Sequence, residues 1–222
     1  MKKTFFYKYI IATFLCAVIS NSAFAEQKFY AGLDLTGQSL SLKKQSDPDL
    51  RIQDIDSFYD TTSGGASIFA GIDFTDKNFK LESFFTVLEG NSKTSSTVYR
   101  GSGVENKSKI NTQIFGVDIK PYKKFTEKTS GYLIAGLNYV KIDIKEVAYI
   151  SADNETYRDS QHVHKIAPSA GIGIEHVILP NLSLRGQVKY VYLNAAVNED
   201  KSGAINKIKY SVLTNIGLSY NF

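Results

Sequence analysis

Apolar and polar residues alternate with a period of two over most of the chain. Between residues 133 and 139 the odd positions are Leu, Ala, Leu and Tyr, whereas Gly136 and Asn138 lie between them. Because successive side chains of a β-strand point to opposite faces, this pattern predicts strands with one apolar and one polar face. Eight such stretches follow one another, at 29–36, 66–74, 79–87, 115–120, 132–139, 166–175, 182–192 and 209–222. The chain is therefore predicted to be all-β, with strands of about 10 residues.

The connections between these strands alternate in length. The long polar ones are residues 43–64, 91–109, 146–162 and 194–206, the tight ones are 75–78 and 179–181, and 121–130 is intermediate. Long loops at one end and short turns at the other are typical of a transmembrane β-barrel, and strands of about 10 residues can cross a bilayer at a tilt.

The two faces separate a membrane barrel from a secreted sandwich. The polar face carries ten charged residues: Asp34, Asp73, Lys80, Glu82, Asp118, Lys120, Glu175, Arg185, Lys189 and Lys209. In a sandwich these charges would face water and the apolar face would form the core. In a small barrel they line the interior and pair, while the apolar face meets lipid. The apolar face has scarcely a charge, and it places Tyr139, Tyr190, Tyr192 and Tyr220 near strand ends, where aromatic girdles lie. We predict an eight-stranded antiparallel up-and-down transmembrane β-barrel.

The first 25 residues have the three parts of a secretory signal. A basic start is followed by an apolar run at 9–19 and by Ala23-Phe24-Ala25. We predict a signal peptide at 1–25, cleaved between Ala25 and Glu26, and a barrel domain at 26–222. An uncleaved anchor is the alternative, but about 20 apolar residues are needed to span a bilayer and Lys8 interrupts the run.

Charge and cysteine content exclude several classes of function. The 222 residues carry a net charge of +4, and three of the lysines lie in the predicted leader, so the remaining chain is near neutral. A nucleic-acid-binding protein would carry a clustered basic excess, so we expect no nucleic-acid partner. The single cysteine, Cys16, also lies in the leader, which excludes disulfide and thiolate chemistry from the predicted domain.

The last quarter of the chain resembles a known family. Residues 171–175 (GIGIE) and 179–190 (LPNLSLRGQVKY) look like the penultimate hairpin of small eight-stranded outer-membrane proteins of the OmpA/OmpX and opacity-protein (porin-family surface antigen) type. The ending, with Tyr220 and a final Phe222, is similar to the signal that the barrel-assembly machinery recognises. The resemblance implies the cell outer membrane of a diderm bacterium, contact with outer-membrane lipid, and extracellular loops. Gln187 stands where many relatives have Glu, which removes one carboxylate from the interior.

The interior charges and the histidines are the candidates for chemistry. We expect Glu82, Glu175, Arg185 and Lys189 to form an ion network that acts as a structural lock, the alternative being a gated ion path. His162 and His164 share a strand face, so a metal site is conceivable, but without a third ligand we expect two exposed histidines. We expect no metal, no cofactor and no enzymatic activity.

Large side chains in the outward loops are the candidates for recognition, because Tyr and Arg are favoured at binding hot spots. They are Phe58, Tyr59, Tyr99, Arg100, Tyr149 and Tyr157. The alternative is that the tyrosines belong to the upper aromatic girdle. Some relatives are host-cell adhesins or bind serum proteins, so the resemblance implies four extracellular loops that bind host or extracellular molecules. The other functions left open are a structural barrel that stabilises the envelope and a narrow, low-conductance porin.

Overall fold

The computed structural model describes residues 27–44, 61–99, 102–150, 155–196 and 205–222. The predicted leader with its cleavage site, and Phe58, Tyr59 and Arg100, lie outside these residues. The strands are β1 (Gln27–Lys44), β2 (Thr62–Phe74), β3 (Phe79–Gly90), β4 (Lys93–Tyr99), β5 (Ser102–Lys124), β6 (Thr129–Ile150), β7 (Glu155–Leu179), β8 (Leu182–Ala196) and β9 (Ile205–Asn221), with a 3₁₀ turn, η2, at Thr75–Lys77. In this part of the chain no helix is long and apolar enough to cross a membrane.

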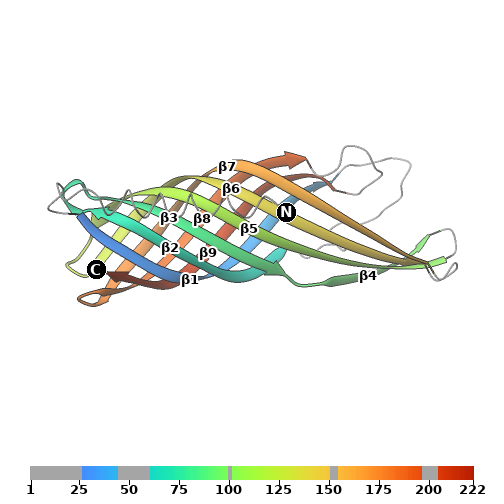
Figure 1. Ribbon diagram of the computed structural model, residues 1–222, viewed down its shortest axis with the longest axis horizontal. Coiled ribbons are helices and arrows are strands. Elements are labelled where there is room, and N and C mark those ends of the chain that lie inside the picture. The colour runs from blue at the N-terminus through green and yellow to red at the C-terminus, as the bar shows by residue number, and fades with distance from the viewer. Residues whose placement is uncertain (1–26, 45–60, 100–101, 151–154, 197–204) are drawn as a thin grey trace, which may run out of the picture.

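The strands form one closed antiparallel wall (Figure 1). Their order is β3-β2-β1-β9-β8-β7-β6-β5-β4, and the additional pairing of β3 with β5 closes the sheet. β3 pairs with residues 111–121 of β5 and β4 with residues 102–108. β3 and β4 therefore occupy successive parts of one position in the wall, and the predicted eight-stranded barrel is confirmed.

Most strands are longer than expected. β3 has 12 residues and β7 has 25, so the expectation of about 10 was wrong. Residues 91–109 and 146–162, expected to be loops, are largely strand where the structure describes them, because β4, β5, β6 and β7 remain paired there. The link at 121–130 shortens to residues 125–128.

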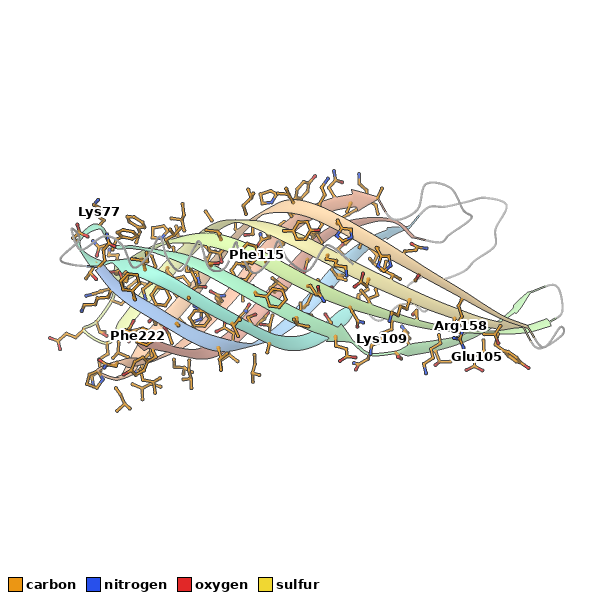
Figure 2. The ribbon with its side chains drawn as sticks, in the orientation of Figure 1. Lys77, Glu105, Lys109, Phe115, Arg158 and Phe222 are labelled. Atoms are coloured by element: carbon orange, nitrogen blue, oxygen red, sulfur yellow. The ribbon has the colours of Figure 1, made fainter. Side chains whose placement is uncertain are left out.

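These extensions build a sheet that projects beyond the barrel. It consists of β4 with residues 102–110 of β5, 144–150 of β6 and 155–161 of β7, and we call it the arm. In Figure 1 the arm tapers away from one end of the molecule, and the short turns lie at the other end. Glu105 and Arg158 accordingly lie far from Lys77 and Phe222 (Figure 2).

The polarity of the two faces inverts along the strands. In the first half of β6, near the short turns, the outward Leu133 and Leu137 are 62% and 60% exposed, whereas Asn138 is buried. Beyond Tyr139 the apolar residues Val140, Ile142 and Ile144 point inward and are buried, while Lys141, Asp143 and Lys145 point outward. β5 shows the same change, from outward Phe115 and Ile119 to inward Ile110 and Ile114. An outward apolar band therefore encircles the barrel. Between this band and the arm, polar side chains point outward and apolar side chains point inward, as in a sheet that faces water on one side.

A bulge in β9 corrects one predicted orientation. Lys209 was expected to point inward but is exposed. Tyr210 pairs with Ser41 and Tyr192, whereas Ile208 pairs with Leu42 and Ala195, so the register shifts around Lys209 on both sides. An extra residue in one strand turns the following side chains to the other face, which places Ile208 inside and Lys209 outside.

Candidate functional site: a filled interior and a projecting arm

Arg185 is the centre of the interior ion network. From β8 its Nε and Nη2 donate to Asp34 on β1 at 2.8 and 2.5 Å, and its Nη1 donates to Glu82 on β3 at 2.5 Å. The guanidinium carbon lies 3.2 Å from the centroid of the Phe69 ring. Arg185, Asp34 and Glu82 are at most 4% exposed. A planar guanidinium suits this position because it binds two carboxylates through separate edges and stacks on an aromatic face.

Glu82 also accepts hydrogen bonds from two other side chains. Lys120 Nζ donates to its Oε1 at 2.5 Å, and the Tyr30 hydroxyl donates to its Oε2 at 3.2 Å. Lys120 additionally donates to Gln187 Oε1 at 3.1 Å. Gln187 therefore also accepts a hydrogen bond from the network.

Two further ion pairs complete the charged layer. Lys189 Nζ lies 2.9 Å from Asp118 Oδ2 and 3.6 Å from the centroid of the Phe84 ring. Lys80 Nζ lies 2.6 Å from Glu175 Oε2. Of the four residues expected to form one cluster, only Arg185 and Glu82 contact each other directly, while Lys189 and Glu175 have other partners.

Glycines make room for the interior aromatic rings. Gly116 is the cross-strand neighbour of Phe84, and a Cβ on Gly116 would lie 2.4 Å from the ring. Gly173 is the neighbour of Tyr132, where the corresponding distance is 2.3 Å. The small residues on the polar face thus let large rings lie flat against the wall, and the rings support the lysines and the arginine.

Between the charged layer and the arm, the interior is filled first by hydroxyl groups and then by aliphatic side chains. The hydroxyls of Thr36 and Thr86 each share a 2.7 Å hydrogen bond with that of Ser67. Toward the arm follows an apolar core that includes Leu40, Leu88, Ile110, Ile114, Val140, Ile142, Ile144, Val163, Leu193, Ile208 and Leu213. This core was not predicted from the sequence, although the inverted alternation from Val140 to Lys145 is a signal for it. Side chains therefore fill the barrel from the charged layer to the base of the arm.

Ion pairs and hydrogen bonds join the outward side chains at the base of the arm. Lys109 pairs with Glu89, and Asp143 pairs with Lys141 at 3.0 Å and with His162 at 2.5 Å. Partial burial of the Asp143 carboxyl favours its protonated form, but hydrogen bonds from His162 and Lys141 outweigh this and lower its pKa below the usual value.

The two histidines proposed as possible metal ligands have separate partners. His162 contacts Asp143, and His164 Nδ1 lies 2.8 Å from the Tyr139 hydroxyl. Within the described ranges no three His, Cys, Asp or Glu side chains come together as a metal site.

The predicted recognition residues fall on the arm where the structure describes them. Tyr149 on β6 is 38% exposed and lies between Glu105 on β5 and Thr156 on β7. The backbone of Tyr99 pairs with Ser102 beside the β4–β5 connection, and that of Tyr157 pairs with Ala148. These three positions lie at one end of the molecule.

Comparison with known proteins agrees with this architecture. A family model described as the outer membrane protein beta-barrel domain matches residues 10–222. The chain belongs to this outer-membrane β-barrel family. The chain is thus an outer-membrane β-barrel protein, and the outward apolar band has the composition of a lipid-facing surface.

Solved structures of outer-membrane barrels are similar at low sequence identity. A major outer membrane protein from Thermus thermophilus gives a TM-score of 0.51 at 10% identity, over 86% of this chain and 99% of that one. OprG from Pseudomonas aeruginosa gives a TM-score of 0.49 at 12% identity, over 88% of this chain and 95% of that one. Neisserial surface protein A gives a TM-score of 0.48 at 14% identity, over 87% of this chain and 97% of that one. No curated protein matches the chain significantly.

The end of this outer-membrane barrel chain lies beside its short turns. Tyr220 pairs with Leu182 just after the β7–β8 turn, and Phe222 is 77% exposed with its ring 5.2 Å from that of Tyr220. Both aromatic side chains are exposed, and Phe222 lies at the opposite end of the molecule from the arm (Figure 2).

Proposed function

We propose that this outer-membrane barrel is a surface interaction protein that holds the arm outside the cell as a binding platform for host or extracellular macromolecules. The observation that carries the proposal is the extension of four paired strands beyond the apolar band, with exposed Lys107, Lys145 and Arg158 on its outer face and Ile110 and Ile144 buried at its base. A loop that only closes a barrel needs few residues, whereas this extension is a paired antiparallel sheet. Tyr149, Tyr99 and Tyr157 on the arm are candidate contacts, and so are Phe58, Tyr59 and Arg100, which lie outside the described residues.

The filled interior supports an anchoring role over transport. An eight-stranded barrel is only wide enough for its own side chains, and here ion pairs and an aliphatic layer occupy the interior of the described part. The charged layer instead cross-links strands far apart in sequence, which favours a rigid frame.

The same proposal assigns an orientation. The leader at 1–25 is removed at Ala25, the short turns face the periplasm, and the arm faces outward. The barrel-assembly machinery recognises the chain end at Tyr220 and Phe222, and the apolar band contacts outer-membrane lipid.

Display of three versions on a non-adherent laboratory bacterium tests the function. The native chain is compared with a version in which residues 91–108 and 147–160 are replaced by short Gly-Ser turns, and with a control that shortens only residues 45–60. Heat-modifiable migration in gels verifies the barrel, and an antibody tag verifies surface display. Binding to host cells and serum proteins is then counted. Loss of binding in the arm-deleted strain alone is the expected result, and equal binding by all three strains would overturn the proposal.

A further inference from the structure

Three oxygen atoms on the inner face of the wall form no hydrogen bond with the described part of the chain. They are Asp118 Oδ1 on β5, Asn138 Oδ1 on β6 and Ser169 Oγ on β7, and none of these residues is more than 8% exposed. Buried polar atoms are nearly always hydrogen-bonded, because an atom taken out of water without a new partner loses its hydration for no return. The three oxygens therefore indicate a ligand on this face.

Two of these oxygens converge over a glycine. Asp118 and Ser169 are the cross-strand neighbours of Gly136 on its two sides. A Cβ on Gly136 would lie 2.0 Å from Asp118 Oδ1 and 3.0 Å from Ser169 Oγ, and these distances from one point place the two oxygens no more than 5.0 Å apart. They do not bond to each other. One water molecule bonds to each of two oxygens at about 2.8 Å, so it can bridge such a separation.

The chemistry of the oxygens selects water over an ion. Asp118 Oδ1 and Asn138 Oδ1 only accept hydrogen bonds, which disfavours an anion. A cation at Asp118 would be repelled by the ammonium group of Lys189, which lies 2.9 Å from the other oxygen of the same carboxylate. Water is neutral, and it can accept a hydrogen bond from the Ser169 hydroxyl while it donates one to Asp118.

Ser169 lies where β7 separates from β8. It pairs with Val191, and this is the last pair between the two strands in the direction of the arm. Residues 155–168 of β7 pair with β6 alone among the described strands, and Pro168, which has no backbone N–H to donate, is the first of them. A water between Ser169 and Asp118 would connect this branch point, through the ion pair of Asp118 with Lys189, back to β8.

We infer that Asp118 and Ser169 bind one ordered water molecule, which holds β7 in place where it separates from β8. This water cross-links β5, β7 and β8 on the inner face, over the space that Gly136 leaves without a side chain. The inference goes beyond the proposed function and needs neither an orientation of the barrel nor a partner for the arm. Its failure would therefore leave the proposed function standing.

High-resolution crystal structures of the full-length barrel, grown in sodium chloride and in rubidium chloride, test the identity of the ligand. We expect a density peak at about 2.7 to 2.9 Å from both oxygens, with no anomalous signal from rubidium. Ser169→Ala should lower the occupancy of this peak at least twofold. Ser211→Ala is the matched control, because it removes an equally buried hydroxyl that already has a protein partner, Gln38, and it should leave the peak unchanged.

Hydrogen exchange of the folded protein in detergent tests the role of the water. After correction for intrinsic rates, the amides of residues 167, 169 and 170 should exchange at least threefold faster in Ser169→Ala than in the native chain. In Ser211→Ala they should change less than twofold.

Four results would overturn the inference. They are the lack of a peak between the two oxygens in the native barrel, a direct hydrogen bond between Ser169 and Asp118, an anomalous rubidium signal at the site, and unchanged exchange in Ser169→Ala. The rubidium signal would assign the site to a monovalent cation.

Discussion

Arg185 and Asp34 face each other across an intervening strand, joined by hydrogen bonds of 2.8 and 2.5 Å. Gly217 on β9 is the cross-strand neighbour of both residues, so their side chains meet above it. A Cβ on Gly217 would lie 2.2 Å from Asp34 Oδ1. The ion pair therefore depends on the absence of a side chain at residue 217.

Replacing Arg185 tests the energy of the network. Arg185→Met leaves Asp34 without its bidentate partner, and removing one partner of a buried ion pair costs about 3 to 5 kcal/mol. Urea unfolding in lipid vesicles measures the change. Lys109→Met, which removes the water-exposed pair with Glu89, serves as the control and should change stability little. Similar losses in both variants would show that the interior pair has no special role.

Two glycine substitutions test the contact at residue 217. Gly217→Ala places a methyl group against Asp34 and the Leu33 carbonyl oxygen, and overpacking of this kind costs about 1 to 3 kcal/mol. Gly186→Ala on the neighbouring strand is the matched control, because its nearest atom would be the Ile174 side chain at 4.0 Å. Equal unfolding free energies for the two variants would contradict the close approach.

Conductance tests the closure of the interior. The charged layer and the aliphatic layer that includes Leu88, Ile114 and Ile142 leave the native barrel without a continuous aqueous path in the described part. Planar bilayer recordings of the purified protein should show no steady open level. A reproducible unitary conductance would favour the narrow porin instead.

The pH dependence at the base of the arm has a definite sign. Because the pKa of Asp143 is lowered on folding, its interactions stabilise the protein at pH values above the unfolded-state pKa of about 3.9. This stabilisation is lost as the pH falls through the lower folded-state pKa. The unfolding free energy of the native chain minus that of Asp143→Asn should therefore be constant from about pH 7 to 5 and shrink below about pH 4. A difference that grows at acid pH would contradict the assigned ion pairs.

Local periodicity was sufficient to predict the barrel but not its ion pairs. The alternation placed Asp34, Glu82 and Arg185 on the inner face because side-chain direction depends only on position along a strand. Partners depend on the register and shear of all eight strands. Glu175 is the direct cross-strand neighbour of Arg185, yet it pairs with Lys80 while Arg185 contacts Asp34 and Glu82.

The arm and the bulge were missed for different reasons. Polar composition at 91–109 and 146–162 indicated loops, but water-facing strands are also polar on one face, and inward Ile142 and Ile144 show that the alternation only changed phase. The bulge at Lys209 depends on pairing with β1 and β8, which no pattern within β9 alone encodes.

Cysteine accessibility on intact cells tests the central claim, an outer-membrane barrel with its arm outside the cell. The one native cysteine, Cys16, is replaced by serine, and single cysteines are placed at Lys145, Leu137 and Lys77. A membrane-impermeant maleimide is applied before and after lysis, and each variant is checked for folding. We predict labelling of Lys145→Cys on intact cells, no labelling of Leu137→Cys in the membrane, and labelling of Lys77→Cys only after lysis. Labelling of Lys77→Cys but not Lys145→Cys on intact cells would contradict the account.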